Sequence, residues 1–343
     1  MKRIKKLFLA VTILFSFFAA GLEAENAVYQ TENYILNVSY NETLVPGDAV
    51  FVRLTVSIPK NAIPKSHKKN EKYVEPERKA TMRLYQGTKV IEKADFYILE
   101  KNKKPYTTEM LCGLPFSTWL KNDAYSIKVI YSFENEELKE FTLPLTYKGR
   151  TFISETIDFD DANSKIKNDN SPERMAQIQK LNNILFTTFP ADTYTNQEFI
   201  KPISSDNYTA YFGDRRTYTY TNGKSETSLH YGNDYGVPEG TPVAACADGR
   251  VVMAEDRIST GWSIVVEHLP GLYSLYYHLS ELNVKEGDFV KQSDIIGKSG
   301  STGLATGPHL HWEMRLNGQA VRPEFFIGNF MQEPDQTKVA AGN

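Results

Sequence analysis

Hydrophobic and polar residues alternate along the N-terminal part of the chain with the period of a β-strand. Apolar residues take every second position from Val50 to Ile58, and a second alternating stretch runs from Tyr125 to Phe133. The turn sequence Pro46-Gly47-Asp48 precedes the first of these stretches. The pattern predicts a mainly β fold whose first part, residues 27–150, is a β-sandwich-like module, with an immunoglobulin-like arrangement as one form of it.

A different period appears between residues 151 and 198, which we interpret as a linker with a helix. Ser171, Pro172 and Glu173 are typical of a helix start, because they supply a capping side chain, a proline in the first turn and an acid near the positive end of the dipole. Apolar residues then recur at helical spacing, at Met175, Ile178, Leu181 and Leu185. We expect a helix that packs between two domains; an insertion that occludes the catalytic cleft is the alternative.

Residues 199–330 are rich in glycine and in short strand-like segments. Asp248-Gly249, Pro270-Gly271 and Asn317-Gly318 are turn sequences. The strand-like segments around them are Val251-Val252, Ile264 to Val266 and Tyr273 to Tyr277. This pattern predicts a compact C-terminal domain built on an antiparallel β-sheet.

The first 24 residues have the pattern of a secretory signal peptide. Four of the residues at positions 2–6 are basic, an apolar run extends from Leu7 to Leu22, and Ala24 offers a small residue for cleavage. The run is shorter than the roughly 20 residues of a membrane-spanning helix, so cleavage is favoured over anchoring. We therefore expect an exported protein, periplasmic or associated with the cell envelope, that stays anchored if the signal is uncleaved. Residues 331–343 are expected to form a polar tail.

Composition adds two exclusions. The net charge is −3 and no strongly basic segment stands out, which gives no electrostatic basis for binding nucleic acid. Cys112 and Cys246 lie far apart and neither belongs to a C-x-x-C pair, which argues against redox chemistry and a thiolate zinc site. Export would permit a disulfide between them, and two buried free thiols are the simpler expectation.

Five of the six histidines lie between His230 and His311, and this clustering indicates chemistry. In a strand, the segment His309-Leu310-His311 would place two imidazoles on one face, because residues two apart point to the same side. His230 and Asp234 are a second candidate pair, and glycines beside them argue against a helix there.

These residues have the chemistry of a zinc site. His230, Asp234 and one histidine of the 309/311 pair would supply two neutral nitrogens and one carboxylate oxygen. Three protein ligands leave a fourth position for water, as in catalytic rather than structural zinc sites. Zinc lowers the pKa of bound water from about 15.7 to about 7, so such a site could supply a nucleophile. Spacing alone leaves open which of His309 and His311 binds the metal.

A zinc hydrolase also needs a proton acceptor. The H-E-x-x-H motif is absent, because no histidine of this chain is followed by glutamate. His278 and His309 are the natural substitutes, since imidazole exchanges protons near neutral pH. His268 precedes Pro270-Gly271, and we expect it to be a structural turn histidine.

Short motifs follow one another in a fixed order over roughly residues 205–327. They are Tyr211-Phe212-Gly213-Asp214-Arg215, His230-x-Gly232-x-Asp234, Gly240-Thr241-Pro242-Val243, Ala247-Asp248-Gly249, Tyr277-His278-Leu279, Gly287-Asp288, Gly297, Gly300-Ser301-Thr302-Gly303 and Gly307-Pro308-His309-Leu310-His311. In this order they resemble the lysostaphin/LytM-type family of zinc endopeptidases, which cut the peptide part of the bacterial cell wall. The resemblance does not extend to the N-terminal module.

The resemblance implies an endopeptidase that hydrolyses peptide cross-links or bridges of peptidoglycan. It implies that His230, Asp234 and His311 bind Zn²⁺, and that His278 and His309 act in catalysis as general base or acid and as oxyanion stabiliser. The implied partner is therefore the peptide of peptidoglycan.

Four residues qualify the resemblance. Asn233 stands where family members usually carry an aliphatic residue, and Cys246 replaces a more ordinary small residue. Some members place a tyrosine near the zinc, and Tyr218 and Tyr220 are the candidates here.

Other functions compete with this interpretation. A non-hydrolysing relative that binds the cell wall or activates another enzyme would typically lack metal ligands, and none is missing here. A swinging-arm carrier has no use for clustered histidines. A phosphate-binding loop at Gly297-Lys298-Ser299 would need a glycine where Gln292 stands. The sequence leaves open which bond is cut, whether the N-terminal module binds the wall or regulates the enzyme, and the oligomeric state.

Overall fold

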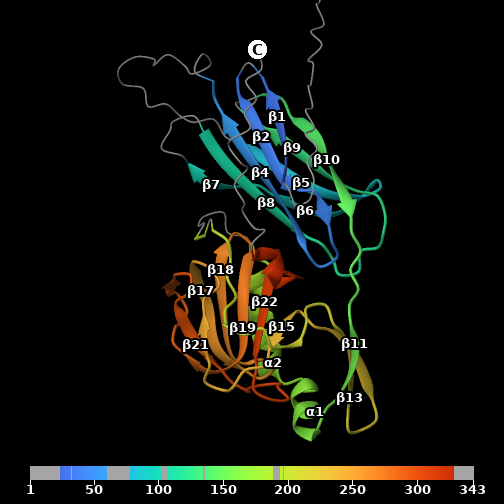
Figure 1. Cartoon of the computed structure of the whole chain (residues 1–343), viewed down its shortest axis with the longest axis vertical. Helices are drawn as coiled ribbons and strands as arrows, with labels where there is room; N and C mark the ends of the chain where they lie inside the picture. The colour runs from blue at the N-terminus through green and yellow to red at the C-terminus, as the bar shows by residue number, and fades with distance from the viewer. Residues whose placement is uncertain are drawn as a thin grey trace, which may run out of the picture.

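The computed structural model describes residues 24–31, 33–59, 78–101, 107–133, 136–187, 194–195 and 197–327. The predicted polar tail and, apart from Ala24, the predicted signal peptide lie outside the described residues. Figure 1 shows a mainly β chain, with a blue-to-green N-terminal module above a yellow-to-red C-terminal sheet. In the described part of the chain, no helix is long and apolar enough to cross a membrane.

Two five-stranded sheets make up the N-terminal module. The first sheet has the strand order β1 (Ala24–Gln30), β2 (Ile35–Asn41), β4 (Ala49–Ser57), β8 (Thr107–Pro115) and β7 (Tyr97–Lys101). The second has the order β3 (Thr43–Leu44), β10 (Lys139–Tyr147), β9 (Tyr125–Ser132), β5 (Lys79–Gln86) and β6 (Lys89–Asp95).

The core of this module lies between its two sheets and follows the predicted alternation. Val50, Val52 and Leu54 of β4 are fully buried, and so are Ile127 and Val129 of β9. They belong to one apolar cluster that draws residues from both sheets. The predicted β-sandwich is therefore confirmed, and its alternation arises because one face of each strand meets the opposite sheet.

The segment between the two β regions contains more structure than the sequence predicted. Its strand β11 (Ser154–Asp158) and helix α1 (Asp161–Lys167) precede helix α2 (Pro172–Leu185). The predicted start of α2 is confirmed, because Ser171 Oγ accepts a hydrogen bond from the backbone N–H of Arg174. Strand β11 pairs in parallel with β13 (Arg215–Thr219), which pairs with β14 (Ser225–Leu229), so this segment is joined to the C-terminal region by a small sheet.

The C-terminal region is built on a ten-stranded sheet whose strand pairs are all antiparallel, as predicted. Its main path has the order β12 (Tyr208–Ala210), β15 (Gly232–Tyr235), β22 (Leu310–Leu316), β19 (Leu272–Leu282), β18 (Gly261–Leu269), β17 (Gly249–Arg257) and β20 (Phe289–Val290). Three short strands lie beside this path, β16 (Pro242–Ala244), β21 (Ile295–Ser299) and β23 (Gln319–Val321), and a 3₁₀ turn, η1 (Pro323–Phe326), follows.

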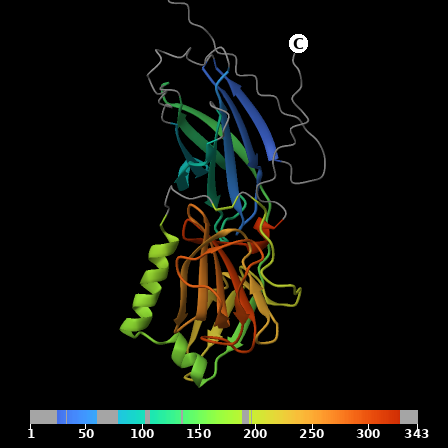
Figure 2. The same ribbon diagram turned by 90° about the vertical axis from the view of Figure 1, so that its left-hand side faces the viewer.

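Both faces of this sheet are covered. On one face, Tyr276 and Trp312 are fully buried in the largest apolar cluster. On the other face, Tyr273 and Tyr277 of β19 belong to a smaller cluster to which Leu185 of α2 contributes. Figure 2 shows α2 lying along the side of the sheet. The expected helix is present, but α2 packs on the C-terminal sheet, on the face that carries His311, since Tyr277 and His311 are register partners.

Polar and aromatic contacts hold the two β regions together. The buried Asp48 of the N-terminal module accepts from Arg150 Nη1 at 2.7 Å and from Arg322 Nε at 2.8 Å. The ring of Phe51 stacks on that of Phe325, with centroids 6.2 Å apart. The N-terminal module is therefore packed on the C-terminal region through buried and half-buried side chains.

Candidate metal centre and active site

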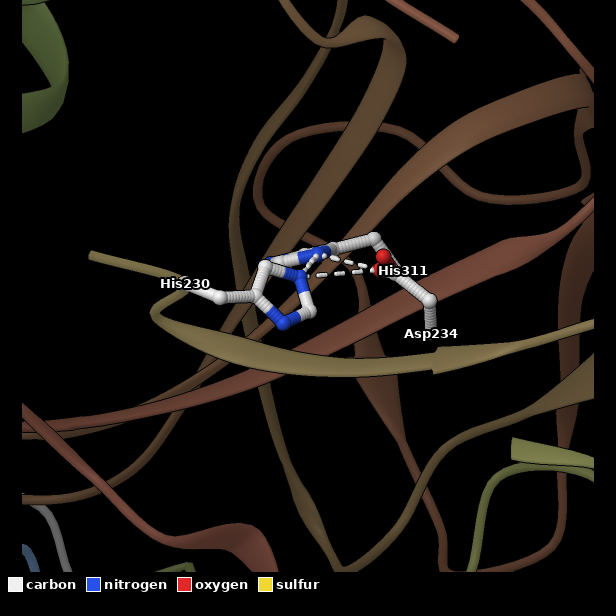
Figure 3. Close-up of side chains that lie close together, drawn as sticks. All are labelled: His230, Asp234 and His311. Carbon is white, nitrogen blue, oxygen red and sulfur yellow. Dashed lines mark hydrogen bonds and ion pairs between the residues drawn. The ribbon is translucent and has the colours of Figure 1, made fainter. Parts of the chain in front are cut away.

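Two neighbouring strands bring the predicted metal ligands together. Asp234 lies in β15 and is the register partner of His311 in β22, so their side chains leave the sheet on the same face. His230 lies just before β15. A Cβ atom at Gly232 would lie 2.3 Å from the backbone oxygen of Trp312, so only glycine permits this close approach of the two strands. Figure 3 shows the three ligand side chains converging.

The converging atoms are one carboxylate oxygen and two ring nitrogens. Asp234 Oδ1 is 3.1 Å from His230 Nε2 and 2.8 Å from His311 Nδ1, and these two nitrogens are 3.1 Å apart. Their outer nitrogens have acceptors of their own. His230 Nδ1 donates to the Tyr211 carbonyl at 2.9 Å, and His311 Nε2 donates to Glu313 Oε2 at 3.3 Å.

This hydrogen bonding makes the three residues fit a metal ion. Because each outer nitrogen is bonded to an acceptor, the neutral form of each ring keeps its proton there and turns the lone pair of its inner nitrogen toward Asp234 Oδ1. A single cation can bind two neutral nitrogens and one carboxylate oxygen that lie this close together, and this donor set suits zinc. All three residues are buried.

Electrostatics at the centre favour a bound cation. Burial alone would raise the pKa of Asp234, but His230 and His311 hold it well below its usual range. Burial would lower the pKa of His311, yet the carboxylates of Asp234 and Glu313 raise it to about 9. In the metal-free protein a proton therefore occupies the centre at neutral pH, and a metal must displace it.

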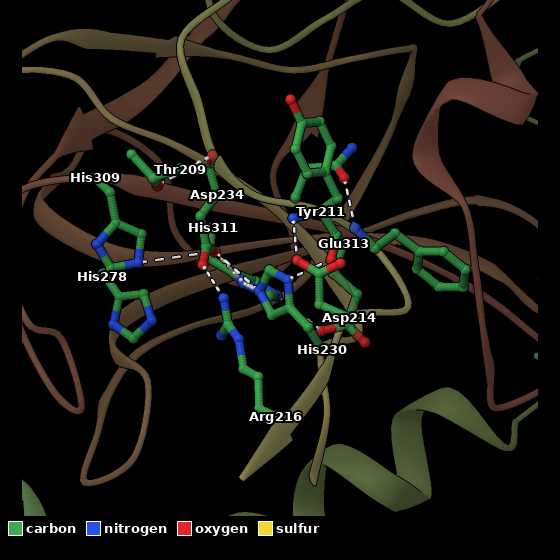
Figure 4. Close-up of polar contacts among 12 residues, drawn as sticks. Thr209, Tyr211, Asp214, Arg216, His230, Asp234, His278, His309, His311 and Glu313 are labelled. Carbon is green, nitrogen blue, oxygen red and sulfur yellow. Dashed lines mark hydrogen bonds and ion pairs between the residues drawn. The ribbon is translucent and has the colours of Figure 1, made fainter. Parts of the chain in front are cut away.

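His278 and His309 lie side by side next to this centre. Their ring centroids are 4.7 Å apart, and His309 Nε2 is 3.8 Å from Asp234 Oδ1 (Figure 4). His309 Nδ1 donates to the Gly307 carbonyl and His278 Nδ1 donates to the Thr302 carbonyl, both at 2.8 Å. Each imidazole therefore has its Nε2 lone pair free to accept a proton.

The environment keeps both of these imidazoles neutral. Burial and the neighbouring histidines lower the pKa of His278 to about 3, and burial lowers the pKa of His309 as well. His278 also has a φ of 60°, a left-handed conformation that is strained for a residue with a side chain. Such strain is typical of positions whose side-chain direction serves a site rather than the fold.

His309 and His268 occupy positions that differ from the prediction. His309 lies in an isolated bridge with Gly300, one residue before β22, rather than inside a strand. His268 lies in β18 rather than in a turn, because its Nδ1 donates to the Asp248 carbonyl at 2.8 Å and draws the ring into the core. Burial lowers the pKa of His268 to about 4, so it is a neutral core side chain.

Of the two departures from the family pattern, Asn233 has a structural role. Asn233 is buried; its Oδ1 accepts from the Phe212 N–H at 2.9 Å and its Nδ2 donates to Glu324 Oε1 at 2.6 Å. An aliphatic residue could make neither bond. Cys246 is a buried free thiol, as is Cys112, so the structure holds no disulfide between them.

The two tyrosines proposed from the sequence have other partners than the three ligands. Tyr218 stacks on Phe159 and interacts with Arg216, the partner of Asp234. The Tyr220 hydroxyl donates to Glu226. A tyrosine ring does lie against a candidate ligand: that of Tyr277 stacks on His311 with centroids 5.3 Å apart.

Sequence reasoning also missed two charged partners of the ligands. Glu313 could have been found, because it stands two positions after His311 in a strand and must share its face. Arg216, whose Nη2 donates to Asp234 Oδ2 at 3.2 Å, carries no such signal, because β13 approaches β15 only through the tertiary fold.

Comparisons with known proteins place this centre in a family. Residues 228–323 match the sequence profile of the family described as Peptidase family M23. They include all three predicted metal ligands and both predicted catalytic histidines.

Three curated relatives show the range of the match. The "DD-carboxypeptidase/endopeptidase Mpg" of Neisseria meningitidis serogroup B (strain ATCC BAA-335 / MC58) is 46% identical over 95 residues, which are 28% of this chain and 22% of that protein. The "Peptidoglycan DD-endopeptidase ShyA" of Vibrio cholerae is 39% identical over 110 residues, 32% of this chain and 25% of that protein. The "Glycyl-glycine endopeptidase ALE-1" of Staphylococcus capitis is 35% identical over 150 residues, 42% of this chain and 40% of that protein. The chain thus spans less than half the length of each.

Proposed function

Residues 228–323 form a domain of peptidase family M23, and from this premise we propose that the chain is a zinc-dependent endopeptidase of bacterial peptidoglycan. The observation that carries the proposal is the convergence of His230 Nε2, Asp234 Oδ1 and His311 Nδ1, with the outer nitrogen of each histidine already bonded. These three atoms would hold the zinc. When bound, zinc supplies Lewis-acid chemistry and lowers the pKa of a water molecule.

The chain's own residues would move the protons. His309 Nε2, 3.8 Å from Asp234 Oδ1, is placed to accept a proton beside the metal position, and the neutral state of its ring keeps that nitrogen available at pH 7. A proton taken up at Nε2 turns an imidazole into a donor. His309 or His278 in that state could protonate the leaving amine or stabilise the developing oxyanion.

The substrate is proposed from the relatives' names. Two of them are named as a peptidoglycan DD-endopeptidase and a glycyl-glycine endopeptidase, so both stem-peptide cross-links and glycine bridges are candidates for this chain. We propose further that the protein acts outside the cytoplasm, because the first 24 residues have the pattern of a signal peptide.

The test compares two histidines of one motif. The purified chain without residues 1–24 is expected to contain about one zinc ion and to release fragments from peptidoglycan of known cross-link chemistry. His311→Ala should lose both zinc and cleavage. His309→Ala should lose cleavage while it keeps most of the metal, because it removes the proton acceptor and leaves the ligands in place.

Metal content and fragment masses decide between the outcomes. Full cleavage by His309→Ala contradicts its role, and equal zinc loss in both variants contradicts the choice of ligand. A wild-type protein that binds zinc and the wall but releases no fragments would instead be a non-hydrolysing wall-binding or activator protein. The fragment masses identify the bond that is cut.

A further inference from the structure

We propose that Arg216 and Glu155 are positioning residues that fix the carboxylate of Asp234 for the metal. The inference rests on the proposed zinc site and extends it to residues outside the matched segment 228–323. It assigns a task to strand β11, which belongs to the segment that connects the two β regions.

The contacts form a chain of three side chains. Arg216 Nη2 donates to Asp234 Oδ2 at 3.2 Å, and Arg216 Nε donates to Glu155 Oε1 at 2.8 Å. Figure 4 shows the guanidinium of Arg216 pointing at the centre. The Arg216 side chain is 12% exposed and that of Asp234 is 10% exposed, so little water competes for either bond.

The two oxygens of Asp234 have separate partners. Oδ1 faces His230 and His311, whereas Oδ2 is bonded to Arg216. An aspartate without the second bond can rotate about its terminal torsion and present either oxygen, or both. The bond to Arg216 selects the rotation in which Oδ1 alone faces the two histidine nitrogens.

Glu155 has two effects on Arg216. It holds the guanidinium by Nε while Nη2 remains directed at Asp234, a geometry that needs the planar fork of arginine and that a lysine ammonium cannot reproduce. It also balances the positive charge of Arg216. A bare guanidinium this close to a divalent cation would repel it, so the glutamate makes the arginine compatible with a metal.

Strand pairing places these residues without any short sequence motif. Glu155 of β11 and Arg216 of β13 are direct register partners in a parallel pair. The preceding residue, Arg215, points to the other side of the strand, where its guanidinium lies 3.7 Å from the ring centroid of Trp119 in the N-terminal module. Strand β13 therefore contacts the N-terminal module with one residue and the metal centre with the next.

The experiment measures zinc affinity by competition with a chromogenic chelator, in the whole chain without residues 1–24. Glu155→Gln and Arg216→Gln should each weaken zinc binding about tenfold or more, as expected for partners of a ligand. Because Glu155 acts through Arg216, the double variant should bind zinc no more weakly than Arg216→Gln alone. Arg216→Lys should recover only part of the affinity.

Arg215→Gln is the matched control, because it removes the same charge from the adjacent position of the same strand. It should keep zinc affinity within about twofold of the wild type. Equal loss in Arg215→Gln would show a general effect of charge or folding and would overturn the proposal. So would tighter zinc binding by Arg216→Gln, since Arg216 would then act only by repulsion.

Two further results also separate the possibilities. Unchanged zinc affinity in Arg216→Gln with a raised KM would place Arg216 on the substrate and overturn the positioning role. If the wild type binds no zinc, the proposed function itself fails. If the wild type binds zinc and all variants bind it equally, only the present inference fails.

Discussion

The two β regions each contribute a buried aspartate, and the two carboxylates have opposite surroundings. Asp48 of the N-terminal module is 5% exposed and Asp234 of the C-terminal sheet is 7% exposed. Each oxygen of Asp48 accepts from both Arg150 and Arg322. Asp234 has arginine on Oδ2 alone, and its Oδ1 faces two histidine nitrogens.

This difference separates a structural carboxylate from one that can bind a metal. Both oxygens of Asp48 are occupied by guanidinium groups that join the two regions, so neither oxygen is open to a metal ion. In their neutral forms His230 and His311 turn the lone pairs of their inner nitrogens toward Asp234 Oδ1, and these three atoms lie close enough together for one metal ion to bind them all. The two aspartates are buried to a similar extent, so the difference between them lies in their hydrogen-bond partners.

The strongest test of this comparison is the same substitution at both aspartates. Asp234→Asn removes the anionic ligand, and we expect zinc affinity to fall more than about 100-fold with loss of peptidoglycan cleavage. Zinc content and cleavage measure this effect. Asp48→Asn is the control and should bind zinc as the wild type does. A similar loss of zinc in both variants would show that the two carboxylates do not differ in role.

The stability of the fold, in contrast to zinc binding, should depend on Asp48. Asp48→Asn leaves two guanidinium groups facing each other at the junction, and we expect it to lower the free energy of unfolding by about 2–3 kcal/mol, because both arginines are partly solvated. Urea unfolding of the zinc-free proteins measures the change. An unchanged free energy of unfolding in Asp48→Asn would contradict the structural role of Asp48.

A third buried ionisable group, His268, allows a test by pH. Burial lowers its pKa from 6.5 to about 4, so the unfolded chain binds a proton more readily than the folded one between these values. The contribution of neutral His268 to the free energy of unfolding is fully present above pH 6.5 and is lost as the pH falls toward 4. The change is on the order of 3 kcal/mol. Unfolding of zinc-free wild type and His268→Gln across pH 4 to 7 measures it. Equal pH slopes in the two proteins would contradict this account.

Local patterns in the sequence determined the elements and the chemistry. Alternation from Val50 to Ile58 specified a strand with one buried face, and the cap at Ser171 specified where α2 begins. The clustered histidines and Asp234 specified a set of groups that can bind a metal. These features could be predicted because strand and helix periods, capping and donor chemistry depend on residues close together in the chain.

Only the tertiary structure decided how those groups are used. Asp234 lies opposite His311, 77 positions later, only because β15 and β22 pair in one particular register. Which nitrogen of each histidine faces Asp234 depends on the hydrogen bond that the other nitrogen makes. The partners of Asp48 lie 102 and 274 positions away. The local sequence determines on which face of a strand a side chain lies. Which residues that face contacts depends on strand register and packing, and no short motif encodes these.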